Sequence, residues 1–362
     1  MTLSARSGAA RAPLSGQRWH FQHGPIDLVL RAWGDAEECA AAYAQAWVRF
    51  ETVLPELVSE LPLLRQPVAA PSCSLPRSGR DGAQAMPLGH CLGSEGRSRA
   101  AGAVPAETPF PHLPSAREVR ANGPLLAHFA GEEKACPPSG PVARRMWRAC
   151  APFADQFITP MAAVAGAVAD EVLAAMIAGR TLAKAYVNNG GDIAIHLAPG
   201  ERFETGIVGD IGKPKLSATA SVAAEDGVRG IATSGWRGRS FSLGIADAVT
   251  VLARDAAAAD AAATMIANAV TTDHPAIERR PARDLDPDSD LREHPVTVSV
   301  GPLDAAALAA ALANGERAAR AYRAAGLLEG AYIELQGRRV AVGGTHAPAA
   351  IRDERMAWSL HA

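Results

Sequence analysis

The sequence has few cysteines, few aromatic residues and almost no net charge. The five cysteines are an odd number and form no C-x-x-C pair, which argues against a disulfide framework or a zinc knuckle. With 36 basic and 38 acidic residues, the chain offers no overall charge that would attract nucleic acid or an anionic membrane. We therefore expect a cytoplasmic protein without nucleic-acid or membrane partners.

Signals for export and membrane insertion are also missing. The N-terminal residues are basic but lack the apolar core of a signal peptide. The most apolar stretch, which starts at Pro160, carries Asp170 and Glu171 near its middle, where a bilayer would penalise both charges. We interpret this stretch as a buried helix.

Several common catalytic motifs are absent. The sequence has no G-x-G-x-x-G opening a helix, no G-x-S-x-G and no H-E-x-x-H. The glycines of "GIVGDIGKP" have the wrong spacing for a phosphate loop, and Pro214 stands where that loop needs a hydroxyl. Dinucleotide binding by a Rossmann motif, serine hydrolysis and zinc proteolysis are therefore not indicated.

What the chain does contain is 48% hydrophobic residues over 362 positions, enough for a large core. Alternating apolar residues predict a strand over 26–33, and apolar side chains at helical spacing predict a helix with Asp35 as its N-cap. Two alanine-rich helices are expected near 162–178 and 253–272. Strands and helices mix without a regular βαβ alternation, so the sequence predicts an α+β fold.

Composition divides the chain into an ordered domain, an insertion and two tails. Residues 18–65 and 140–345 carry the periodic pattern and are expected to form one α+β domain. Residues 66–139 are rich in proline, glycine, serine and arginine, which predicts a disordered insertion. Residues 1–17 and 346–362 are expected to be a flexible N-terminal tail and a C-terminal tail.

The segment "AYVNNGGDIAIHL", residues 185–197, places a turn between two apolar runs. Asn189 followed by Gly190 is typical of a type I′ hairpin turn. The paired glycines, Gly190 and Gly191, would also let a phosphate or a ring approach the backbone next to Asp192. These two interpretations do not exclude each other.

The second alanine-rich helix carries a polar stripe, Asp260, Thr264 and Asn268, at four-residue spacing. A carboxylate and a hydroxyl on one face are oxygen ligands of the kind that Mg²⁺ prefers. The alternative is a solvated polar face on a surface helix. The loop "ATSGWRGRSFS", residues 232–242, adds hydroxyl and amide groups after a predicted strand, where binding residues often lie.

The order of four segments is more specific than any one of them. "VAGAVADEVLAAM", "YVNNGGDIAI", "IATSGW" and "ADAAATMIANAV" together resemble the FAD:protein FMN transferase (ApbE-like) superfamily, over about residues 159–270. The resemblance implies an ApbE-like α+β fold that binds FAD, or a related flavin nucleotide, with Mg²⁺. The implied flavin-binding residues are Asn188, Gly190, Gly191, Asp192, Thr233, Ser234 and Gly235, and the implied Mg²⁺ ligands are Asp260 and Thr264.

The resemblance also implies a reaction, in which a threonine hydroxyl of an acceptor flavoprotein attacks the FAD pyrophosphate, retains FMN as an ester and releases AMP. The transferases carry a His-x-x-Asp-Pro-x-Thr-Gly segment after the T-S-G loop, whereas residues 236–258 here contain neither histidine nor proline. The usual Lys-Gly is replaced by Ala165-Gly166. Asp247 is a hypothetical catalytic base because of its location, and a helix cap is the alternative.

Three functions remain open at this point. The first is Mg²⁺-dependent FAD binding with pyrophosphate cleavage or FMN transfer. The second is a non-catalytic flavin-binding, carrier or assembly module on the same fold. The third is a site adapted to another small ligand.

Overall fold

The computed structural model describes residues 8–69, 137–208, 216–343 and 350–353. All described residues belong to one compact unit. Most of the segment expected to be a disordered insertion, residues 70–136, lies outside the described residues.

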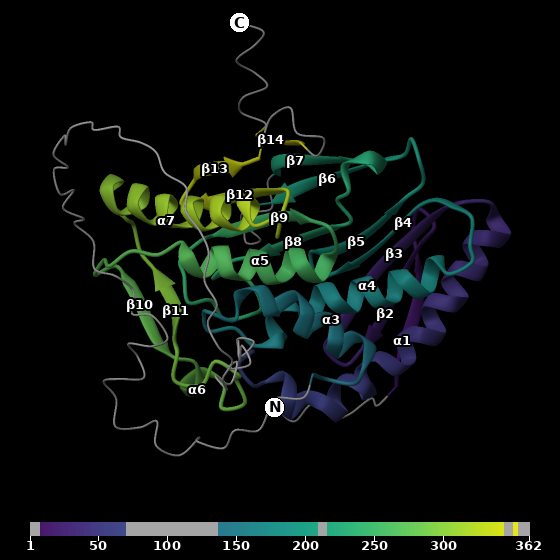
Figure 1. Cartoon of the computed structure of the whole chain (residues 1–362), viewed down its shortest axis with the longest axis horizontal. Coiled ribbons are helices and arrows are strands. Elements are labelled where there is room, and N and C mark those ends of the chain that lie inside the picture. Colours follow the sequence, from purple (N-terminus) through teal and green to yellow (C-terminus); the bar gives the residue numbers. More distant parts are fainter. Residues whose placement is uncertain (1–7, 70–136, 209–215, 344–349, 354–362) are drawn as a thin grey trace, which may run out of the picture. The chain divides into compact units, whose positions relative to one another are not determined.

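The centre of the described unit is one antiparallel sheet of nine strands in the order β1-β2-β3-β4-β5-β8-β9-β12-β13 (Figure 1). This mixture of a large sheet with several helices is the α+β class that the sequence predicts. The strands are β1 (Ala10–Leu14), β2 (Arg18–His23), β3 (Ile26–Gly34), β4 (Leu182–Asn189), β5 (Asp192–Leu197), β8 (Gly230–Ser234), β9 (Ala248–Ala253), β12 (Gly330–Leu335) and β13 (Arg338–Val342).

Helices cover one face of this sheet (Figure 1). They are α1 (Ala36–Leu64), α3 (Pro141–Cys150), α4 (Val164–Ile177), α5 (Ala256–Ala269) and α7 (Ala305–Ala324). The predicted strand over 26–33 and the two alanine-rich helices are confirmed. The Asp35 carboxylate accepts hydrogen bonds from the backbone N–H groups of Glu37 and Glu38, which confirms it as the N-cap of α1.

The opposite face of the sheet is covered in part by a second sheet of three strands in the order β14-β7-β6. Its strands are β6 (Arg202–Val208), β7 (Leu216–Ala223) and β14 (Ala350–Asp353). Alternate side chains of the large sheet, such as Ile195 and Leu252, are buried against Ala220 and Val222 of β7 in a second apolar cluster. The remaining elements are β10 (Ile277–Pro281), α6 (Ala282–Leu285), β11 (Pro295–Val300) and the single-turn helices η1 (Ala151–Phe153), η2 (Pro160–Ala163) and η3 (Ala224–Asp226).

Helices α4 and α5 meet at their N-terminal ends. A Cβ at Gly166 of α4 would collide with the backbone carbonyl of Ala256 in α5, so the small residues permit a close crossing. Within the described residues, Pro160–Ile177 is the one helical span long and apolar enough to cross a membrane, and half of it is buried inside the protein. That burial agrees with the expectation of a core helix.

Both predicted tails contain regular structure. β1 pairs with β2 as the first strand of the large sheet, so order begins inside the segment 1–17 that was expected to be flexible. β14 pairs with β7 inside the predicted C-terminal tail, 346–362. Hydrophobic periodicity could not find β1, because all five of its residues are exposed.

Candidate functional site

The "NNGGD" segment forms the hairpin between β4 and β5. Gly190 and Gly191 have φ values of 67° and 117°, and Asn189 pairs with Asp192 across the turn. The predicted hairpin is therefore confirmed, but its central residues are the two glycines and not Asn189 with Gly190. The reason is that only glycine adopts both of these φ angles without strain.

Alternation along the hairpin separates two asparagines that are adjacent in the sequence. Asn189 faces the helices, where its Nδ2 donates to the carbonyl oxygen of Ala165 over 3.1 Å. Asn188 points to the other face of the sheet, and its Oδ1 accepts from the backbone N–H of Gly191 over 2.8 Å. The structure thus does not bring Asn188 together with Asp192, which lies on the helix face beside Asn189.

Two acidic side chains from separate motifs each accept a backbone hydrogen bond, and the charge of Asp192 acts on Asp260. Asp192 Oδ1 accepts from the backbone N–H of Thr233 over 3.2 Å. Asp260 Oδ2 accepts from the backbone N–H of Gly166 over 3.0 Å. We refer to Asp192, Asp260 and Thr264, which is one turn further along α5, as the carboxylate site.

Burial and mutual repulsion dominate the electrostatics of this site. Burial raises the pKa of Asp192 to about 7, although the Thr233 N–H and the positive charge of Arg239 act in the opposite direction. Burial and the nearby charge of Asp192 raise the pKa of Asp260 well above its usual range. The charged forms of both carboxylates are therefore disfavoured in the absence of a nearby positive charge.

The polar stripe of α5 faces protein and not open solvent. Asn268 Oδ1 accepts from the backbone N–H of Leu243 over 3.0 Å and from the Ser242 hydroxyl over 3.3 Å. Asp260 and Thr264 are both partly buried. The alternative of a solvated polar face does not describe this helix, because the loop that follows β8 and the start of α4 cover its polar side.

The predicted binding loop lies at the end of β8. The Thr233 hydroxyl shares a hydrogen bond of 2.8 Å with the hydroxyl of Thr250, while its N–H contacts Asp192. Ser234 ends the strand and is partly buried. Gly235 is buried so tightly that a Cβ there would collide with the backbone carbonyl of Asp247. Thr233 thus links the loop to Asp192 and Thr250 through hydrogen bonds, and Gly235 allows the loop to pack against the backbone of Asp247.

Asp247 is held by several donors and does not cap a helix. It directly precedes strand β9, so the helix-cap interpretation is wrong; the following apolar run is buried in the sheet. Its Oδ1 accepts from Trp236 Nε1 over 3.3 Å and from Arg237 Nε over 3.2 Å. Its Oδ2 accepts from the backbone N–H of Gln336. These hydrogen bonds make the Asp247 side chain a structural link between the loop and the β12–β13 hairpin.

The donor set of the carboxylate site fits a magnesium ion. The described residues contain no group of three or more His, Cys, Asp and Glu side chains that could hold a metal. Mg²⁺, however, commonly binds through one or two carboxylates and completes its shell with water and substrate phosphate oxygens. Two repelling carboxylates, with Thr264 as a third oxygen donor, suit an ion of this kind.

Sequence reasoning missed three contributors to this region. Arg239 approaches the hairpin so closely that a Cβ at Gly190 would collide with its guanidinium. Asp170 accepts from the N–H groups of Ala256 and Ala257, over 3.0 and 2.9 Å, and so caps α5 from α4. In the opposite direction, Asp260 of α5 accepts from the N–H of Gly166 and so caps α4. A charge inside the apolar stretch was the one visible signal for Asp170; no pattern in the sequence pointed to Arg239.

The sequence also matches a family model described as "AbpE bacteria" over residues 10–90 and 117–342. It is similar to a UPF0280 protein of Methanothrix thermoacetophila, 42% identical over 135 residues, which are 37% of this chain and 54% of that protein. A UPF0280 protein of Methanopyrus kandleri is 40% identical over 136 residues, 37% of this chain and 51% of its own. A third, of Methanothermobacter thermautotrophicus, is 36% identical over 159 residues, 43% of this chain and 58% of its own.

This chain spans about half the length of the curated relatives that it matches. The family model, in contrast, covers most of the chain, including the nine strands of the large sheet and the carboxylate site. The chain therefore belongs to the AbpE bacteria family.

Proposed function

We propose that this chain is an ApbE-like protein that binds FAD, or a related flavin nucleotide, with Mg²⁺ at the carboxylate site, and that it cleaves the pyrophosphate or transfers FMN. The observation that supports this proposal is that Asp192 and Asp260, from two separate motifs, lie close enough for the charge of Asp192 to raise the pKa of Asp260. Two neighbouring acids whose charged forms are disfavoured by burial have a reason to bind a divalent cation.

In this proposal, each side chain has a definite task. Asp260 and Thr264, together with Asp192, would hold Mg²⁺, which would neutralise negative charge on the pyrophosphate oxygens. The hydroxyl oxygen of an acceptor threonine would form the new bond to the phosphorus of the FMN half. The bond from that phosphorus to the bridging oxygen would break, AMP would leave with that oxygen, and the hydroxyl proton would pass to a base.

A second candidate function is a flavin-binding carrier or assembly module without chemistry. Asp247 is the acid in the segment that replaces the histidine-bearing motif, and its oxygens are already occupied by Trp236, Arg237 and Gln336. A carboxylate whose two oxygens already accept from three donors is not free to take a proton from an acceptor hydroxyl. This observation favours binding without transfer.

The experiment is to incubate the purified full chain with FAD, with and without Mg²⁺, and to measure binding by flavin fluorescence and AMP release by chromatography. We expect Asp260→Asn to abolish Mg²⁺-dependent binding, and to lower any AMP release by about a hundredfold or more. Asp255→Asn is the matched control, because it changes a carboxylate that caps the same helix, through the N–H of Ala258, and lies outside the carboxylate site.

Each outcome has a distinct meaning. AMP release that needs Mg²⁺, and that Asp260→Asn loses while Asp255→Asn keeps it, supports an enzyme. Mg²⁺-dependent binding without AMP release, also in the presence of a cell extract as the source of acceptor, supports the carrier. The absence of FAD binding at any Mg²⁺ concentration rejects both flavin functions.

A further inference from the structure

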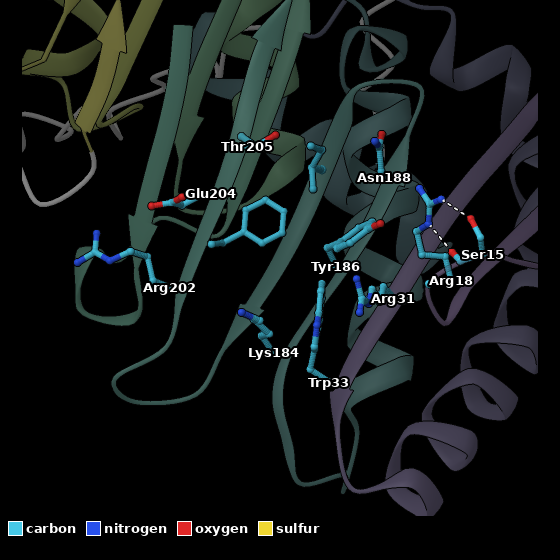
Figure 2. A pocket seen from close by; sticks show the side chains of 13 residues that line it. Ser15, Arg18, Arg31, Trp33, Lys184, Tyr186, Asn188, Arg202, Glu204 and Thr205 are labelled. Carbon is cyan, nitrogen blue, oxygen red and sulfur yellow. Dashed lines mark hydrogen bonds between the residues drawn. The ribbon is translucent and has the colours of Figure 1, made fainter. Parts of the chain in front are cut away.

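A second candidate site lies on the face of the large sheet that the helices do not cover. It is a pocket of about 770 Å³, a size within the range of small-molecule sites, ~300–1,000 Å³. Its floor is β3 and β4, one wall is β6 of the three-stranded sheet, and the other is the turn between β1 and β2 (Figure 2). We call it the basic-aromatic pocket.

The pocket concentrates positive charge in a chain that is nearly neutral overall. Its lining includes four cationic side chains from four different strands and one carboxylate, Glu204. Among the residues that the structure describes, the one acidic ion-pair partner of these cations is Glu201, whose Oε2 lies 3.7 Å from Lys184 Nζ. The four cations are Arg18, Arg31, Lys184 and Arg202.

Arg31 lines the pocket, and its Nε is a hydrogen-bond donor that has no acceptor among the described residues. Its guanidinium lies over the ring of Trp33, 4.3 Å from the centroid, and Lys184 Nζ lies 5.2 Å from the same centroid. Its Nε is buried and has no hydrogen-bond partner in the described part of the chain. Arg31 and Lys184 thus bring two positive charges to one ring in the lining of the pocket, and these charges would attract an anionic group of a ligand.

Aromatic rings lie beside these charges. Tyr186 is 5.9 Å from Trp33 and 5.8 Å from Phe203, measured between ring centroids. Figure 2 shows Trp33 and Tyr186 on neighbouring strands, with Arg202 and Glu204 across from them on β6. Arg18 borders the pocket and is held in place by hydrogen bonds to Ser15 O and Oγ, of 2.9 and 3.3 Å. Planar rings next to guanidinium groups suit an aromatic base with a phosphate.

We propose that the basic-aromatic pocket binds a nucleotide-sized ligand that carries both a phosphate group and an aromatic ring. The cations recognise the phosphate, and Trp33, Tyr186 and Phe203 contact the ring. The pocket and the carboxylate site lie on opposite faces of the sheet, since Asn188 lines the pocket while Asp192 faces the helices. This inference does not depend on the proposed flavin function.

The test uses adenosine monophosphate as the probe, with the full chain and EDTA present, so that a magnesium-dependent site makes no contribution. Calorimetry measures the affinity, and tryptophan fluorescence reports the location. We expect binding of AMP that Arg31→Gln, and independently Lys184→Gln, weakens by about tenfold. Trp33→Phe should remove most of the fluorescence change. The control is Arg254→Gln, which removes a cation whose side chain is 64% exposed and lies outside the pocket.

Several results would overturn the proposal. One is the absence of AMP binding at millimolar concentration, and another is an equal affinity in folded Arg31→Gln, Lys184→Gln and the unaltered chain. Inorganic phosphate that binds as tightly as AMP would reject recognition of the ring, and adenosine that binds as tightly would reject recognition of the phosphate. A single-stranded oligonucleotide that binds more than about tenfold tighter than AMP would show a nucleic-acid surface in place of a nucleotide pocket.

Discussion

Asp170 and Asp260 are acidic side chains that each cap the neighbouring helix. Asp170 of α4 accepts from two N–H groups of α5, and Asp260 of α5 accepts from Gly166 of α4. Each carboxylate thereby satisfies orphan donors at a helix N-terminus. Burial raises the pKa of both acids. At the scale of the residue, the same carboxylate oxygens that cap a helix would also bind the cation in the proposed function.

Asp170 gives a prediction for the pH dependence of stability. Burial, followed by the charge of Asp255, raises its pKa to about 7. Its contribution to stability is complete below the unfolded pKa, about 3.9, and is lost as the pH rises through the folded pKa. We expect the unfolding free energy to fall with pH in that window, with about 1.4 kcal/mol per pH unit coming from this group.

The measurement is denaturant unfolding between pH 4 and 8, for the unaltered chain and for Asp170→Asn. The variant should be less stable overall, because an amide cannot accept both N–H groups, but its stability should depend less on pH. Asp192 and Asp260 are present in both proteins, so the difference between the two curves reports Asp170 together with its charge interaction with Asp260. Parallel curves would show that Asp170 has an ordinary pKa in the folded protein.

At the scale of the element, the crossing of α4 and α5 depends on small residues. Gly166 lies against the backbone of Ala256, whereas Gly315 of α7 lies against the side chain of Val270. A backbone atom cannot move without shifting a whole helix, while a side chain can change its rotamer. The position of the carboxylate site depends on the first of these contacts, since Asp260 reaches the N–H of Gly166 only at close approach.

These two glycines therefore form a matched pair of substitutions. Both gain helix propensity on replacement by alanine, by up to about 1 kcal/mol. We expect Gly166→Ala nonetheless to destabilise the protein by ~1–3 kcal/mol, as overpacking does, and to weaken the proposed Mg²⁺-dependent FAD binding. Gly315→Ala should cost less in thermal or denaturant unfolding. Equal costs would contradict a backbone contact specific to the α4–α5 crossing.

At the scale of the whole described unit, the large sheet is buried on both faces over part of its width. Leu30 of β3 is fully buried under the helices, and Ile195 of β5 is 1% exposed under the three-stranded sheet. Val29 of β3 is partly buried and lies on the face opposite the helices. The basic-aromatic pocket forms where the second sheet stops and leaves β3 and β4 uncovered.

This arrangement predicts the cost of three truncations. Leu30→Ala and Ile195→Ala should each lower the unfolding free energy by ~2–5 kcal/mol, because both remove a large side chain from a packed layer. Val29→Ala should cost about 1 kcal/mol or less, because its side chain is not enclosed between two layers. Denaturant unfolding of the three variants checks this order. An Ile195→Ala variant as mild as Val29→Ala would mean that the three-stranded sheet does not pack as a layer.

The sequence by itself determined the local structure and the chemical character of the chain. Its periodicity determined β3, the alanine-rich helices and the α+β class, and glycine chemistry determined the β4–β5 hairpin, because these features depend on neighbours in sequence. Tertiary structure decided which side chains meet. Asn188 and Asp192 lie on opposite faces of the sheet, and Asp260 contacts Gly166. The basic-aromatic pocket is formed by strands that are far apart in the chain. Those contacts depend on strand order and helix crossing, which a one-dimensional pattern does not specify.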